Sequence, residues 1–169
     1  MATTVKTTIS LEMQLLEQGS IDLGSAQALL PILKRFDLAS GTGDNTFDML
    51  WSDTRTLTAT SETLDLSGSL SSALGVSITF VEVGVIYIYN RATAAASVLL
   101  VGNGAAPAYV GFLSAGTAKL TIPASGLNLW YAPLDGGGLT VANTTAQDLK
   151  IDAGAATITY DIILVGRSA

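Results

Sequence analysis

Hydrophobic and polar residues alternate near the start of the chain, and this spacing is typical of a β-strand. Between residues 5 and 15 the chain switches regularly between mostly apolar and polar positions. A period of two places successive side chains on opposite faces of an extended chain. The sequence therefore predicts a strand with one apolar face, made of Val5, Thr7, Ile9, Leu11, Met13 and Leu15.

The most strand-like stretch is Val76 to Asn90, VSITFVEVGVIYIYN, which is rich in β-branched and aromatic residues. Both of its faces are apolar, so we expect other parts of the structure to cover it on both sides. Glu82 and Gly84 interrupt the pattern, which indicates a β-bulge or the close approach of another backbone. The rest of the body is expected to pack around this strand.

Shorter elements are predicted on either side of it. Residues 25–30 could form one helical turn before Pro31, and Ile32 to Leu38 alternate as a second strand. A glycine-rich turn cluster at residues 40–45 divides the chain into an N-terminal part, residues 1–45, and a body, residues 46–169. Tyr109 to Leu113 is one of the short strands expected in the body.

About ten short strands with regularly spaced turn signals predict an all-β fold. We expect an antiparallel β-sandwich of the jelly-roll type. Its N-terminal part would be an extended β arm or hairpin that is packed on, or exchanged with, neighbouring subunits. The sequence shows no long amphipathic helix that would favour another class.

The composition favours an oligomer. Charged residues make up 13% of the chain, about half of the usual ~25% for soluble domains. A monomer would expose a large surface of small and apolar residues, which other subunits can cover. We therefore expect the chain to bind copies of itself.

The charge pattern argues against several kinds of partner. The formal net charge is −6 and the basic residues are scattered, so the sequence lacks the basic stripe of a nucleic-acid-binding protein.

No apolar run approaches the ~20 residues that span a bilayer as a helix. The N-terminus also lacks the apolar segment of a secretory signal, so we expect a soluble protein made in the cytoplasm.

The residue types needed for most catalysis are missing. The chain has no cysteine and no histidine, which removes the commonest nucleophile–base pairs and the commonest metal ligands. Acidic residues such as Asp44, Asp48 and Glu62 fall in predicted turns or strand edges, where solvated carboxylates are usual. We expect no enzyme activity, no catalytic residue, no cofactor and no metal site.

Contact residues can be proposed from the pattern instead. Asp53 and Arg55 lie on one face of a predicted strand that also contains Trp51, and these three residues could contribute to a subunit interface. Trp130 and Tyr131 could stack on a sugar, although such aromatics more often belong to a core or an interface. The N-terminal interface candidates are Val5, Ile9, Leu11 and Met13.

Five segments together resemble small structural proteins of tailed bacteriophages, many of them encoded near the major capsid protein. The segments are WSDTRTL from Trp51, ETLDLSGSL from Glu62, VLLVG from Val98, LTIPASG from Leu120 and TITYDIILVG from Thr157. They are strand and turn patterns without catalytic signatures, and they run through residues 46–166.

This resemblance implies a virion component. The expected role is a head decoration or cement protein that binds the capsid exterior and stabilises contacts between capsomers. Its partners would be the phage major capsid protein and further copies of itself, with a trimer as the expected state. A tail, head–tail or fibre component is the alternative within the same class, and a carbohydrate-binding receptor reader is the alternative from another class.

Overall fold

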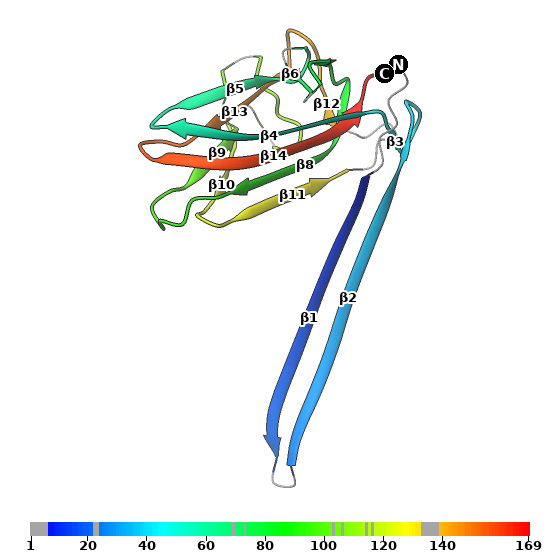
Figure 1. Ribbon diagram of the computed structural model, residues 1–169, viewed down its shortest axis with the longest axis vertical. Coiled ribbons are helices and arrows are strands. Elements are labelled where there is room, and N and C mark those ends of the chain that lie inside the picture. Colours follow the sequence, from blue (N-terminus) through cyan, green and yellow to red (C-terminus); the bar gives the residue numbers. More distant parts are fainter. Residues whose placement is uncertain are drawn as a thin grey trace. The chain divides into compact units, whose positions relative to one another are not determined.

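A computed structural model describes residues 7–21, 24–68, 70–72, 74–102, 104–105, 107–113, 115, 117–132 and 139–169. The chain divides into two compact units, of which one is Lys6–Ala39 and the other contains Ser40–Ala169. We call them the hairpin and the body (Figure 1). The division falls before the turn cluster at residues 41–45, because the second strand of the hairpin continues to Ser40.

The hairpin consists of two long antiparallel strands, β1 (Thr7–Ile21) and β2 (Gly24–Ser40). The alternating pattern of residues 5–15 and 32–38 is thus confirmed as strand over the described residues. The prediction of a helical turn at residues 25–30 was wrong, because these residues pair with β1 as a strand. Pro31 lies opposite Gln14, and it fits there because each strand of a two-stranded hairpin has a free edge for a residue without an N–H.

The body is an antiparallel β-sandwich, which confirms the predicted all-β class. Within the described residues we find no helix that is long and apolar enough to cross a membrane. The strands of the body are β3 (Thr46–Phe47), β4 (Met49–Thr58), β5 (Ser61–Asp65), β6 (Leu70–Ser71), β7 (Ser77–Ile78), β8 (Glu82–Asn90), β9 (Leu99–Gly102), β10 (Lys119–Ile122), β11 (Leu127–Tyr131), β12 (Leu139–Thr140), β13 (Asp148–Asp152) and β14 (Thr157–Arg167).

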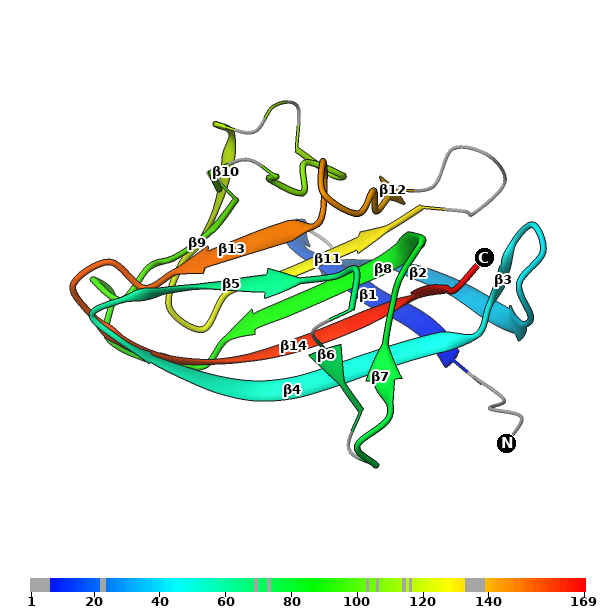
Figure 2. The same ribbon diagram turned by 90° about the horizontal axis from the view of Figure 1, so that it is seen from above.

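Two sheets form the layers of the sandwich (Figure 2). The large sheet has the order β11-β8-β14-β4, and β12 also pairs with β8. The small sheet has the order β10-β9-β13-β5. Most of the apolar residues that face the other sheet are almost fully buried and form one core, which includes Ile86, Ile88, Leu149, Ile151, Ile162 and Leu164.

The stretch from Val76 to Asn90 is divided into two strands. Its first part forms the short β7, which pairs with β6, and its second part forms β8. β8 lies inside the large sheet between β11 and β14, and most of its side chains are buried. The expected covered strand is therefore β8. The expected strand at Tyr109 to Leu113 is not formed: these residues make turns, and Tyr109 is buried in the core.

The interruption at Gly84 marks a β-bulge, as its sequence indicated. The register between β14 and β8 shifts where Val165 pairs with Val85 and Gly166 pairs with Val83, so Gly84 is the extra residue. The buried ring of Phe47 lies directly over Gly84, where any side chain would collide with it. A glycine is required here because another group approaches the backbone closely.

Candidate functional site

One face of the hairpin is apolar and exposed. The register places Ile9 opposite Phe36, Leu11 opposite Lys34 and Met13 opposite Ile32, and directly opposite residues share a face of the hairpin. The exposed fractions are 46% for Leu11, 49% for Met13, 40% for Ile32 and 39% for Phe36. Exposing apolar side chains to water to this extent costs free energy. We call it the apolar face of the hairpin.

The opposite face of the hairpin is mostly polar. The hydroxyl of Thr8 donates to Asp37 Oδ1 at 2.9 Å, and the guanidinium of Arg35 pairs with the same carboxylate at 3.0 Å. Ser10 also lies on this face, while Leu33 is its exposed apolar exception. The hairpin is thus amphipathic. A two-stranded hairpin is marginally stable alone in water, so covering its apolar face would stabilise it.

On its outer face the large sheet is apolar around β8 and β11, whereas Thr54, Thr56 and Thr159 make it polar around β4. On the large sheet, cross-strand register places Tyr87 and Tyr89 of β8 beside Leu129 and Leu127 of β11, with Ile163 of β14 next to Tyr87. Leu127 is 56% exposed and Leu129 is 42% exposed. The outer face of the small sheet carries polar residues in the corresponding rows, namely Ser61, Thr63, Asp65, Asp148, Lys150 and Asp152.

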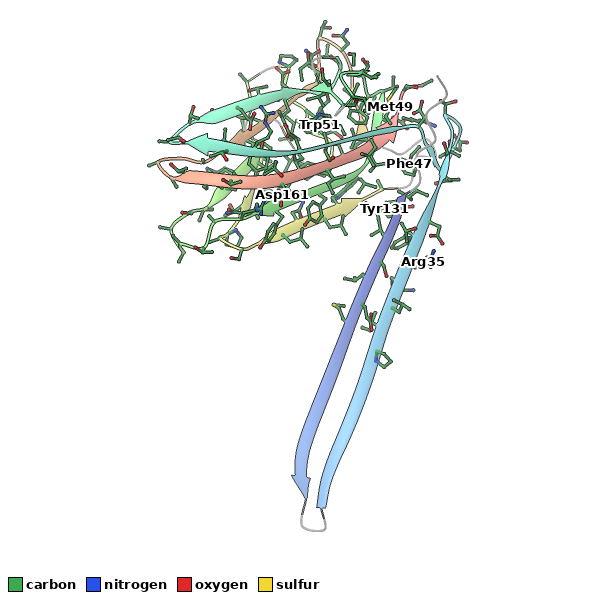
Figure 3. All side chains as sticks on the ribbon, in the orientation of Figure 1. Arg35, Phe47, Met49, Trp51, Tyr131 and Asp161 are labelled. Atoms are coloured by element: carbon green, nitrogen blue, oxygen red, sulfur yellow. The ribbon has the colours of Figure 1, made fainter. Side chains whose placement is uncertain are left out.

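A shallow hollow of about 580 Å³ lies on the outer face of the large sheet, lined in part by Tyr87, Ile163 and Asp161. Asp161 accepts a hydrogen bond from the Thr54 hydroxyl at 2.6 Å and pairs with Arg91 at 3.4 Å. Both contacts use its Oδ1 atom, and Figure 3 shows where Asp161 lies on β14. This surface therefore combines aromatic and aliphatic side chains with one carboxylate.

Asp53 and Arg55 form the expected pair on β4, and they belong to a larger network. Arg55 Nη1 lies 2.9 Å from Asp53 Oδ2, and Arg55 Nε donates to Glu62 Oε2 at 2.6 Å. The buried Tyr160 hydroxyl donates to Glu62 Oε1 at 2.6 Å. The bond with Glu62 raises the pKa of Arg55 above its usual value. Burial, followed by the bond with Glu62, raises the pKa of Tyr160, so the phenol stays protonated.

This network joins the two sheets at one edge of the sandwich. Arg55 and Tyr160 belong to the large sheet, whereas Glu62 belongs to β5 of the small sheet. A groove of about 350 Å³ beside it is lined by Trp51, Asp53, Arg55, Thr63, Leu64, Leu70 and Ser71. The contacts of Arg55 with Glu62 and of Glu62 with Tyr160 were not predicted from the sequence, because no local pattern links residues that meet only across strands.

Replacing Glu62 with glutamine is expected to destabilise the body. The variant removes the charge that Arg55 pairs with and weakens the acceptor of the Tyr160 hydroxyl. Because Arg55 is partly exposed, we expect a loss of about 1–2 kcal/mol in the free energy of unfolding. Urea unfolding followed by tryptophan fluorescence measures it. Asp53→Asn is the matched control and should cost under about 1 kcal/mol; an equal loss in both variants would contradict the role given to Glu62.

The structure places the other predicted contact residues unequally. Ile9, Leu11 and Met13 lie together on the apolar face of the hairpin, while Val5 lies outside the described residues. Trp51, labelled in Figure 3, belongs to β4. It is 4% exposed, and its indole N–H donates to the Ser71 carbonyl at 3.1 Å. Trp51 is therefore a core residue, which corrects its assignment as an interface residue.

The two aromatic residues proposed for a sugar lie on opposite faces of β11. Trp130 lies opposite the buried Ile86, packs against the core and contacts the ring of Phe112 at a centroid distance of 6.3 Å. Tyr131 lies opposite Val85, on the outer face of the large sheet. The two rings therefore face opposite sides of β11, and their contact with a glycan stays a prediction.

The described residues contain no group of three or more His, Cys, Asp and Glu side chains that could hold a metal ion. The most distinctive surfaces described above are the apolar face of the hairpin and the outer face of the large sheet. Both expose apolar side chains, which suits them to binding another protein. No family model, no curated protein and no solved structure matches the chain.

Proposed function

We propose that this chain is a structural protein of a bacteriophage virion, a head decoration or cement protein that binds the capsid exterior and stabilises contacts between capsomers. The apolar face of the hairpin carries the proposal. It is a long β surface with Leu11 and Met13 nearly half exposed, and it has the character of a surface made to be covered in an assembly. The protein acts by burying this surface between subunits.

The strand order supports a capsid-type fold. When the two-residue strands are left aside, consecutive strands of the body lie in different sheets, except for β9 and β10. This order is expected when two Greek keys are wound into a jelly roll, which occurs in viral capsid domains and in lectins. We therefore propose that the sandwich is a jelly roll. The resemblance of residues 46–166 to tailed-phage structural proteins supports the capsid assignment.

Binding to capsids tests the proposal. Shells assembled from the major capsid protein without this chain are incubated with the purified full-length protein and sedimented. We expect saturable binding and a higher temperature of shell disruption. Leu11→Asp should weaken the binding at least tenfold, since it places a charge on the apolar face of the hairpin. Ser10→Asp places the same charge on the opposite face and should bind normally. A chain that does not bind shells would overturn the decoration role.

The alternatives make different predictions in the same material. A tail, head–tail or fibre component would bind tails and not head shells. A receptor reader would bind glycans, since the jelly roll is also a lectin fold. A glycan array with the full-length protein separates this case: specific hits would favour the receptor reader, and a decoration protein gives none.

A further inference from the structure

We propose that the apolar face of the hairpin packs on the outer face of the large sheet of a second copy of this chain. This inference rests on the proposed function, in which the hairpin is buried in an assembly, and it names the surface that the hairpin covers there. Both surfaces are uncovered apolar β faces of the same molecule, and sheets pack face to face through such side chains.

The chemistry of the two surfaces is complementary. The hairpin offers flexible aliphatic and thioether side chains, including Leu11, Met13 and Ile32. The outer face of the large sheet offers Tyr87 and Tyr89 beside leucines. Tyrosine and methionine are enriched in protein interfaces, and the outer face of the small sheet has no comparable row among the described residues.

Charge distribution favours the same arrangement. Residues 6–39 carry three basic and four acidic side chains, whereas the rest of the chain carries five basic and ten acidic ones. Two acidic bodies repel each other, while a nearly neutral hairpin can approach a body. Lys34 is a cation on the apolar face of the hairpin, and Asp161 is a carboxylate on the outer face of the large sheet. The Oδ2 atom of Asp161 has no partner within the described residues, so it can accept Lys34.

The hairpin is longer than the outer face of one body. Its fifteen paired residues span about 50 Å, whereas β14, the longest strand of the large sheet, has eleven residues and spans about 37 Å. One body face is therefore too short to cover the whole hairpin. Hairpin-to-body contacts are heterologous, so repetition of the contact from copy to copy builds a closed ring or an open filament.

Packing on a face explains more than addition of a strand at an edge. If β1 extended a neighbour's sheet, its backbone groups would be paired, but Leu11 and Met13 would remain in water. Face-to-face packing removes these side chains and Leu129 from water together. The sheet edge at β4 is in addition flanked by the ionic network of Asp53, Arg55 and Glu62, which is poorly suited to an apolar partner.

Cysteine cross-linking tests the arrangement, because the chain has no cysteine of its own. Full-length Met13→Cys in unlabelled form is mixed with ¹⁵N-labelled Leu129→Cys and treated with a short bis-maleimide. Both positions are exposed, so both variants should fold, which circular dichroism checks. We expect mixed-label peptides that join residues 13 and 129, at a yield at least tenfold above two control pairs. Ser10→Cys with Leu129→Cys tests the polar face of the hairpin, and Met13→Cys with Thr63→Cys tests the small sheet.

The outcomes separate this inference from the proposed function. Equal yields in the target and control pairs overturn the inference. A second test uses one chain that carries both Met13→Cys and Leu129→Cys, cross-linked at high dilution. If residues 13 and 129 are then linked only within one chain, the inference is also overturned. If the chain still binds capsid shells in either case, the proposed function stands. If it binds no shells and stays monomeric at every concentration, both proposals fail.

Discussion

A chain that begins at residue 37 is expected to keep a folded body and to lose assembly. The truncation removes the apolar face of the hairpin but retains Leu38, the one buried apolar residue found in the described part of the hairpin. Five apolar side chains are removed from this face, of which four are 39–49% exposed and Ile9 is half-buried. Each would contribute about 1 kcal/mol when covered. Together they amount to about 5 kcal/mol per hairpin, which is more than a thousandfold in an association constant.

Sedimentation velocity and capsid binding measure this effect, and thermal unfolding shows whether the body stays intact. We expect a monomer that does not bind shells and that unfolds cooperatively close to the temperature of the full-length body. Full-length Ser10→Asp is the control for a charge on the hairpin that spares the apolar face. A truncated chain that assembles and binds like the intact protein would contradict the role of the hairpin.

Gly166→Ala is expected to cause the largest loss of stability from a single methyl group. Gly166 lies in β14 at the bulge, where an added Cβ would overlap the carbonyl oxygen of Glu82 and lie 2.8 Å from Phe80 Cδ1. The carbonyl belongs to the neighbouring strand and Phe80 is buried, so neither can move without disrupting the sheet. We expect a loss of about 3 kcal/mol and a melting temperature lower by roughly 10 °C.

Urea unfolding of the full-length protein checks this value. Gly43→Ala serves as the control, since a Cβ at Gly43 meets nothing within 4 Å and its backbone does not require glycine. It should change the stability by less than about 0.5 kcal/mol. Equal stabilities for the two variants would show that the bulge tolerates a side chain and that the described packing is wrong at this point.

The fold was predictable where the pattern had a single period. Alternation in residues 5–15 and 32–38 gave the hairpin strands, and two apolar faces identified β8 as an inner strand. Residues 25–30 were misassigned because leucine and alanine suit a helix, yet pairing with β1 outweighs that local preference. The division between β7 and β8 was missed because β7 pairs with β6, a partner that local sequence does not reveal.

The candidate site was less predictable, because it depends on which residues become neighbours across strands. Asp53 and Arg55 were found because they are two positions apart on one strand. Glu62 and Tyr160 join them only through the packing of two sheets. The pattern also cannot tell which of two apolar faces turns outward, so Tyr87 and Tyr89 were expected to be covered within the body and instead form part of its outer surface.

The number of copies per purified virion, measured by quantitative mass spectrometry against the major capsid protein, tests the central claim most directly. A head decoration protein predicts a ratio near one copy for each capsid protein. A ratio of a few copies per particle would contradict decoration of the head lattice and would favour a connector, spike or receptor reader. Absence of the chain from virions would contradict a structural role in the particle.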